Sequence, residues 1–187
     1  MTAAVVADPM VSVGPVVFVD TNILAYCHDS AQGRKKVMAE DLLARLWQQQ
    51  GGRTSMQVLN ELYVTLTRKL PHPLPRDIAW RITEDLLVWS PLPTDRRLLT
   101  RAREVETRYR LNWWDALIVA AAQLQDCTTL LTEDLQDGMD FDGVRVGNPF
   151  RAGVAEEAPP YSTGPRRVAP ANPRHRGRGR PRRQAVV

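Results

Sequence analysis

Apolar residues are grouped along this chain in short runs and in helical stripes, and the first run raises a question. In the stretch GPVVFVDTNILAY, an apolar run from Val16 to Val19 ends directly in Asp20. A run this short, rich in β-branched and aromatic residues, predicts a buried strand. A charged residue at the end of such a strand requires a physical reason.

Helical patterns and short apolar runs alternate over the residues that follow. The pattern predicts strands near residues 52–56, 88–92, 128–134 and 143–148. Helices are predicted for residues 34–50, 55–70, 76–87, 94–110 (N-cap Thr94) and 112–126 (N-cap Asn112). One apolar face is expected to hold Val58, Leu59, Leu62 and Leu66, and another Leu98, Leu99, Ala102, Val105 and Tyr109.

Strands that alternate with helices predict an α/β fold with a central parallel sheet and helices on both faces, because the crossover connections are right-handed. In such sheets, sites form outside the carboxyl ends of the strands. Asp20 after the first strand and Asp134 after the strand near residue 130 are expected at this edge. Glu61 on a helix flank and Asp115 in the first turn of the last helix are candidates to join them.

Each of these acids has an alternative explanation. Asp115 follows Asn112 by three residues and could complete a capping box, and Glu61 could be a solvated flank of its helix. Asp134 lies in an acidic, turn-like stretch, and Asp20 could cap the residues behind it through an Asx turn. The functional interpretation depends on the combination of the four.

Carboxylates that meet at close range repel one another and take up protons unless a cation neutralises them. A cluster of oxygen ligands alone suits Mg²⁺ or Mn²⁺, which can activate water for attack on a phosphate. Thr21, Asn22 and Thr132 are adjacent polar residues suited to orienting the ligands. Three scattered histidines make a histidine-based metal site improbable.

Charge is distributed unevenly along the chain. Residues 151–187 contain nine arginines and two glutamates, a formal charge of +7, whereas the whole chain carries +4, so residues 1–150 carry −3. This Pro-, Gly- and Arg-rich tail is expected to be disordered, and residues 1–14 a flexible extension. The tail of residues 151–187 could be a solubilising extension or an arm that binds nucleic acid. Arg176, Arg178 and Arg180 lie in its Arg-Gly run.

Two distant cysteines, Cys27 and Cys127, form neither a disulfide framework nor a zinc pattern, which favours a reducing compartment. The N-terminal residues lack a basic region before their apolar part, and no run has the roughly 18–20 apolar residues of a membrane span. We therefore expect a cytoplasmic protein that does not bind membranes.

Four motifs and the end of this region, in their order along the chain, resemble the PIN-domain ribonucleases found as VapC-type toxins in bacterial VapBC toxin–antitoxin pairs. The resemblance covers residues 16–150, the expected globular domain of residues 15–150. The matching stretches are VFVDTNILAY (17–26), SMQVLNELYVTL (55–66), WWDALIVAAA (113–122), LLTEDLQDG (130–138) and VRVGNPF (144–150).

This resemblance implies a three-layer α/β/α sandwich and an endoribonuclease that depends on Mg²⁺ or Mn²⁺. It also implies RNA as substrate, a cognate antitoxin and a homodimer. Position by position, it makes the four acids catalytic, with Asp20, Asp115 and Asp134 as metal ligands. Asn22 is the amide that follows the first acid, and Thr132 is the hydroxyl before the last.

Other functions remain open from sequence. An RNA-binding module without turnover would use the Arg-rich tail. A phosphatase of the aspartyl-phosphate type would need an acid where this chain has Asn22. Arginines of the 94–110 helix are expected to form ion pairs at i,i+4 spacing, with a minority free for phosphates. Trp113 and Trp114 could stack on a base, although packing is expected for at least one.

Overall fold

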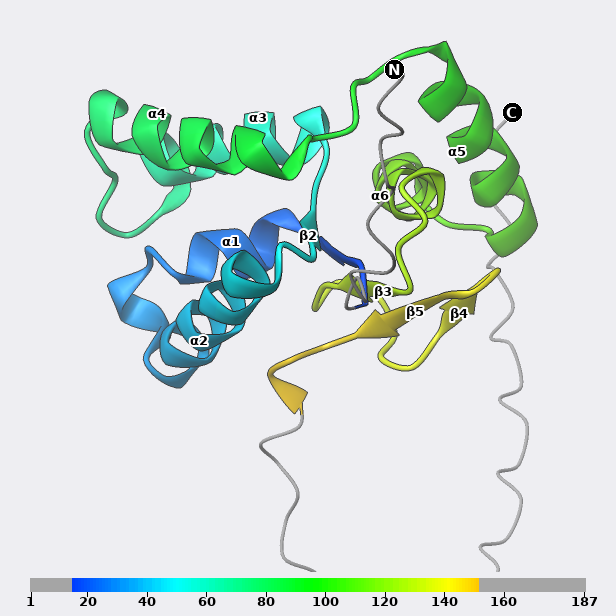
Figure 1. Ribbon diagram of the computed structural model, residues 1–187. Helices are drawn as coiled ribbons and strands as arrows, with labels where there is room; N and C mark the ends of the chain where they lie inside the picture. The colour runs from blue at the N-terminus through cyan, green and yellow to red at the C-terminus, as the bar shows by residue number, and fades with distance from the viewer. Residues whose placement is uncertain (1–14, 152–187) are drawn as a thin grey trace, which may run out of the picture. The chain divides into compact units, whose positions relative to one another are not determined.

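A computed structural model describes residues 15–151 of the chain (Figure 1). The expected extension at residues 1–14 and residues 152–187 of the expected tail, including Arg176, Arg178 and Arg180, lie outside the described residues. The elements are β1 Val17–Val19, α1 Thr21–Tyr26, η1 Ser30–Gln32, α2 Arg34–Gln49, β2 Gly52–Arg53, α3 Met56–Val64, η2 Thr65–Lys69, α4 Arg76–Asp85, η3 Leu86–Trp89, α5 Arg96–Tyr109, α6 Trp113–Leu124, β3 Thr129–Leu131, β4 Asp140–Phe141 and β5 Val144–Gly147.

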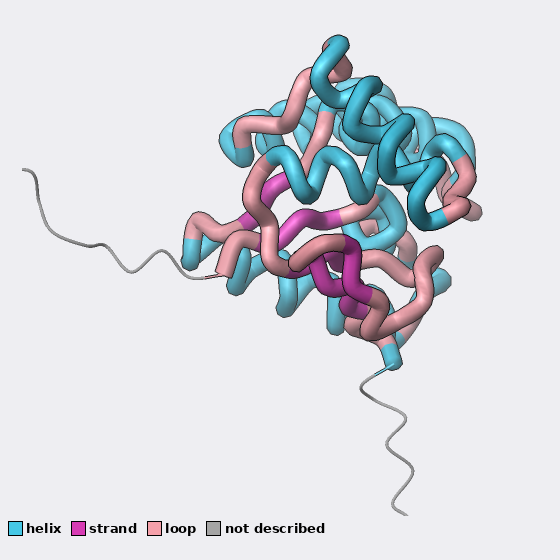
Figure 2. Tube along the Cα trace, turned by 90° about the vertical axis from the view of Figure 1, so that its right-hand side faces the viewer, coloured by secondary structure: helices cyan, strands magenta, loops and turns pink. Residues whose placement is uncertain are grey.

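Five strands form one sheet in the order β2-β1-β3-β5-β4. Three pairings are parallel: β2 with β1, β1 with β3, and β3 with β5. Phe18 of β1 lies opposite both Arg53 and Leu130. Helices lie on both sides of the strands in Figure 2. The predicted α/β fold, with a mostly parallel sheet flanked by helices, is therefore confirmed.

The sequence patterns did not predict strand β4, which pairs antiparallel with β5. Asp142 and Gly143 connect the two strands, with φ angles of 53° and 94°. An Asp-Gly pair with both residues in the left-handed region is typical of a two-residue hairpin turn. The Gly143 N–H donates to Asp140 Oδ1 over 2.9 Å, which closes the turn.

The core lies around β1 and α6. Phe18 and Val19 have no exposed surface, because β1 is central in the sheet and is covered by helices. Ala116–Ala122 of α6 are buried, which explains why this helix is apolar on nearly all sides. The predicted apolar face of α3 is also buried, at Val58, Leu59 and Leu62, and continues to Leu66.

Three expectations about local structure are wrong. Residues 88–92 do not form a strand; the chain forms a 3₁₀ turn through Trp89 and only Leu92 bridges to Ser55. Asp95, not Thr94, caps α5, because its carboxylate accepts the Leu98 N–H over 2.9 Å. Leu99, expected on the apolar face of α5, is 42% exposed, because the buried stripe is narrower than the apolar pattern.

Gly52 in β2 lies directly beneath the buried indole of Trp89. A Cβ atom at Gly52 would lie 2.5 Å from Cε2 of the Trp89 ring, closer than a real contact allows. Trp89 packs in turn against Trp47, with ring centroids 5.3 Å apart. The position thus requires a residue without a side chain.

We predict that Gly52→Ala lowers the free energy of unfolding by about 2 kcal/mol, because the methyl group overpacks this site. Urea denaturation measures the change. In a Trp89→Leu background the penalty is expected to fall below about 0.5 kcal/mol, since the ring is gone. Trp47→Leu is the matched control and should leave the penalty in place. Equal penalties in all three backgrounds would contradict the proposed clash.

Candidate active site

Asp20 lies between the carboxyl end of β1 and the first residue of α1. Its backbone N–H donates to the Leu131 carbonyl over 3.0 Å, as though the strand continued for one more residue. Its carboxylate accepts the Thr21 N–H over 2.6 Å and so caps α1. The residue is only 8% exposed. Asp20 therefore caps the residues that follow it, through the adjacent Thr21 N–H and not through the expected Asx turn. This cap uses one carboxylate oxygen and leaves the other to be explained.

The second oxygen of Asp20 belongs to a network that crosses the sheet edge. The Thr132 hydroxyl donates to Asp20 Oδ2 over 2.7 Å. The Asn22 amide donates to Asp20 Oδ2, to Thr132 Oγ1 and to Asp134 Oδ2, over 3.3, 3.1 and 3.0 Å. The structure therefore brings Asp20 and Asp134 together around one side-chain amide, with Thr132 fully buried beneath them.

Glu61 reaches the same group of residues from α3. The Thr21 hydroxyl donates to Glu61 Oε2 over 3.1 Å, and the Gln57 amide donates to Glu61 Oε1 over the same distance. Glu61 and Asp134 also line one cavity, of about 350 Å³, together with Thr21 and Asn22. Glu61 is thus half-buried and hydrogen-bonded on both oxygens, which argues against a purely solvated flank.

Asp115 joins the group less directly. Its N–H donates to Asn112 Oδ1 over 3.0 Å, and its Oδ2 accepts from the Asn112 amide over 2.6 Å. This is the predicted Asn112 cap, reinforced by a side-chain pair. Burial raises the pKa of Asp115, and the charge of Asp134 raises it further. No hydrogen bond joins Asp115 to Asp134 among the described residues, so the charge of Asp134 acts on Asp115 without direct contact.

The electrostatics of the group are unfavourable for its negative charge. Burial raises the pKa of Asp20 from 3.8 to about 6, against the hydrogen bonds from Thr132 and Thr21, which lower it. The charges of Asp134 and Glu61 raise the pKa of Asp20 as well. Without a cation, part of the Asp20 population is therefore protonated near neutral pH.

The donor set fits a hard divalent cation. The atoms with which the four acids, Asn22 and Thr132 could bind a cation are all oxygens. One of them, Asn22 Oδ1, is buried without a hydrogen-bond partner. Three acceptors around its Nδ2 fix the orientation of this amide, so the unpaired oxygen is not exchangeable with the nitrogen. Within residues 15–151, however, no three His, Cys, Asp or Glu side chains already converge on one point as metal ligands do.

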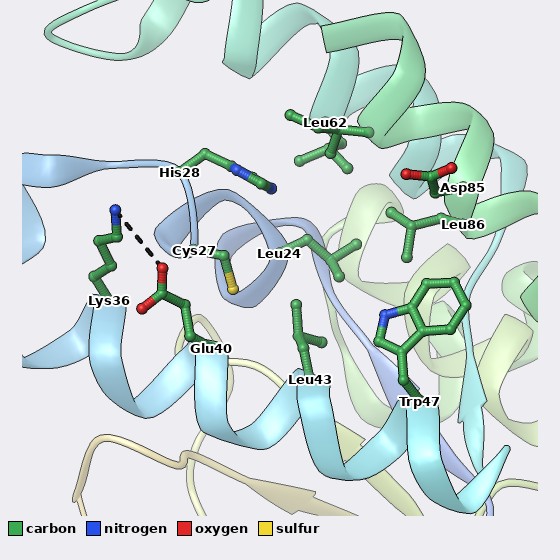
Figure 3. Close-up of a pocket in the computed structure, with 11 residues that line it drawn as sticks. Leu24, Cys27, His28, Lys36, Glu40, Leu43, Trp47, Leu62, Asp85 and Leu86 are labelled. Carbon is green, nitrogen blue, oxygen red and sulfur yellow. Dashed lines mark ion pairs between the residues drawn. The ribbon is translucent and has the colours of Figure 1, made fainter. Parts of the chain in front are cut away.

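A larger cavity, of about 500 Å³, is separate from this group (Figure 3). Leu24, Cys27, Lys36, Glu40 and Trp47 are among its lining residues, and none of the four acids is. Burial raises the pKa of the Cys27 thiol to about 12, so it is no nucleophile at neutral pH. Of the two carboxylates that line the cavity, Glu40 is ion-paired with Lys36 and Asp85 comes from another helix.

Sequence reasoning missed a cluster at the rim of the acidic group. Glu133 accepts hydrogen bonds from the Tyr26 hydroxyl and from Lys35 Nζ, the latter over 2.6 Å. Lys35 Nζ also lies 4.7 Å from the Tyr26 ring centroid and 5.3 Å from that of Phe150. These contacts hold the loop that carries Asp134. The sequence signal was weak: three of the four residues lie far from Glu133 along the chain.

The residues considered as RNA contacts differ in their surroundings. On α5, Arg101–Glu104 and Arg103–Glu106 form ion pairs at i,i+3, not at the expected i,i+4 spacing. Trp113 packs partly against the core, as expected for one of the pair, whereas Trp114 is 62% exposed.

In the described part of the chain, no helix has the length and apolarity needed to cross a membrane.

Comparisons with known proteins bear on the fold and the family of the chain. A search of curated proteins gives no match. Among solved structures, a toxin–antitoxin complex from Klebsiella pneumoniae has a chain of similar fold, with a TM-score of 0.51 and 21% identity, over 72% of this chain and 97% of that one. The sequence model of the family described as PIN domain matches residues 17–138, which include all four acids. The chain belongs to the PIN domain family.

Proposed function

We propose that this protein is a metal-dependent endoribonuclease that hydrolyses RNA phosphodiester bonds, with Asp20, Glu61, Asp115 and Asp134 as its acidic site. The observation that carries the proposal is the Asn22 bridge between Asp20 and Asp134, with Glu61 attached through Thr21. Such a group of carboxylates destabilises the fold unless a cation neutralises it, so its natural role is to bind one.

Asp20, Asp115 and Asp134 would hold Mg²⁺, and Mn²⁺ would substitute for it. The bound ion supplies an activated water and neutralises charge that develops on the phosphate. The residues of the chain orient this site: the Thr132 hydroxyl and the Thr21 N–H fix the Asp20 carboxylate, and Asn22 fixes Asp134. Glu61, held by Gln57 and Thr21, is positioned to accept a proton from water.

The proposal extends to the biological setting. The Klebsiella pneumoniae protein of similar fold is part of a toxin–antitoxin complex. We infer by analogy that this chain is the toxin of a VapBC-type pair, acts on RNA in the cytoplasm, binds a cognate antitoxin and forms a homodimer. Family membership and the fold support this inference, together with the intact set of four acids.

The first test is cleavage of a mixed pool of structured RNAs by the purified full chain. We expect cleavage with Mg²⁺ or Mn²⁺, none with EDTA, and none from the Asp20→Asn, Asp115→Asn double variant, since both ligands lose their charge. Gel electrophoresis of end-labelled RNA detects the products. The matched control is the Asp41→Asn, Asp126→Asn double variant, which makes the same charge change at two exposed positions and should retain activity.

Two outcomes would overturn the proposal. Cleavage that persists in the Asp20, Asp115 variant would assign the activity to a contaminant. RNA retention without any cleavage, lost when residues 151–187 are deleted, would instead favour a binding module held through the tail.

A second prediction concerns stability without metal. The folded pKa of Asp20, about 6, exceeds its ordinary 3.8, so this group stabilises the fold fully below about pH 4. That contribution is lost as the pH rises through about 6, and a shift of about two pH units corresponds to about 3 kcal/mol. Urea denaturation in EDTA should show wild type losing stability over this range more steeply than Asp20→Asn.

Addition of Mg²⁺ at neutral pH should then raise the stability of wild type and leave Asp20→Asn nearly unchanged, because the variant lacks the ligand charge. Asp115 and Glu133 also have raised pKa values and act in the same direction in both proteins, so the comparison isolates Asp20. Parallel stability curves for the two proteins across this pH range would contradict the prediction.

A further inference from the structure

The cavity of about 350 Å³ that Glu61 and Asp134 line, the acidic cavity, has a neighbour of about 400 Å³, called here the second cavity. Glu61 and Lys69 line both cavities. Trp114 and Val64 are apolar residues that line the second cavity, and Gln57 and Asn60 line it as well. An aromatic face with apolar walls and a few amide groups is the kind of surface that accepts a nucleobase.

Trp114 has features that packing does not explain. It is 62% exposed, although it directly precedes Asp115 and the neighbouring Trp113 is packed on the core. In residues 15–151 its ring makes no ring–ring or cation–π contact, whereas Trp47 and Trp89 pack on each other. A large apolar ring left in solvent beside an acidic site is available for stacking.

Lys69 is the one cationic side chain among the described residues that line either cavity. It is exposed and forms no ion pair with any carboxylate in the described part of the chain. An RNA backbone that approaches four acids meets repulsion, so a lysine at their margin would offset it at the point of entry.

The backbone around Lys69 is itself unusual. The helix that starts with α3 ends in the π-helical turn η2, closed by a hydrogen bond from the Leu70 N–H to the Thr65 carbonyl over 3.2 Å. The hydrogen bond of such a turn spans five residues instead of the four of an α-helix. Thr65 and Lys69, the first and last residues of this turn, both line the acidic cavity. π-turns occur frequently at functional sites.

We propose that this second cavity is a nucleotide-binding subsite for single-stranded RNA, in which a base stacks on Trp114 and Lys69 holds the phosphate between that base and the acidic site. The inference rests on the proposed ribonuclease function and adds to it a subsite for one base and its phosphate, formed by Trp114 and Lys69. Unpaired RNA is required, because a base within a duplex cannot reach an indole ring.

The test compares variants of the full chain in two assays on single-stranded poly(U) and poly(A). Cleavage gives kcat/KM, and ultraviolet cross-linking of the RNA, followed by peptide mass mapping, gives contact without turnover. Trp114→Ala should lower kcat/KM about tenfold, the size expected for one stacked base, and Trp114→Phe should restore most of it. The wild-type cross-link should map to the peptide that contains Trp114.

Lys69→Ala should also lower kcat/KM about tenfold and reduce the slope of log(kcat/KM) against log salt by about one, while Lys69→Arg should retain both. An abasic ribose-phosphate oligomer separates the two roles. As a competitive inhibitor of cleavage it should be weakened by Lys69→Ala and unaffected by Trp114→Ala. Trp80→Ala, which removes a 53% exposed indole on α4, is the matched control and should behave as wild type.

Distinct outcomes separate the subsite from the function beneath it. Wild-type cleavage with unchanged kcat/KM in Trp114→Ala and Lys69→Ala would overturn the subsite and leave the nuclease intact. Absence of cleavage in every protein, wild type included, would remove the function on which the subsite rests. A change in oligomeric state of Trp114→Ala by light scattering, with normal cleavage, would show that the indole covers a second copy of the chain and would also overturn the subsite.

Discussion

Burial of a carboxylate beside other acids, at one edge of a parallel sheet, is the constraint on which the rest of this structure depends. β1 and β3 run in the same direction, so Asp20 and the loop that carries Asp134 leave the sheet side by side. Burial leaves Asp20 with little water to stabilise its charge, and its pKa rises to about 6. The Thr21 N–H, the Asn22 amide and the Thr132 hydroxyl hold this unfavourable carboxylate in place, at a cost in stability that a purely structural role would not require.

Neutral donors, not cations, hold the acids in place. Asn22 donates to two carboxylates and to Thr132, and Thr21 connects the first acid to Glu61. Of the lysines near the acids, Lys35 is bound to Glu133 at the rim and supports the loop, and Lys69 lines the cavity without an ion pair to a carboxylate of the described residues. A lysine at the centre would neutralise the acids permanently and block a metal ion, whereas an amide orients them and leaves their charge available.

The sequence predicted the parts of this arrangement that depend on strand ends. Asp20 and Asp134 follow apolar runs, and the rule for parallel sheets brings them together. It did not predict the contribution of Lys35, Glu133 and Phe150, because tertiary packing alone joins them. The strand predicted at residues 88–92 does not form, because burial of Trp89 against Gly52 outweighs the local strand propensity. The π-turn at Lys69 has no sequence signal at all, since it changes register within a helical pattern.

Asp115 shows that a structural explanation and a functional one need not exclude each other. The capping bond that stabilises α6 runs from the Asp115 N–H to Asn112 Oδ1, and it does not involve the carboxylate. The carboxylate bond to the Asn112 amide is solvent-exposed, so exchanging it for a cation costs little. The helix would therefore keep its cap if the Asp115 carboxylate exchanged this bond for a cation. An aspartate at this position satisfies the helix through its backbone, which leaves its charge for the site.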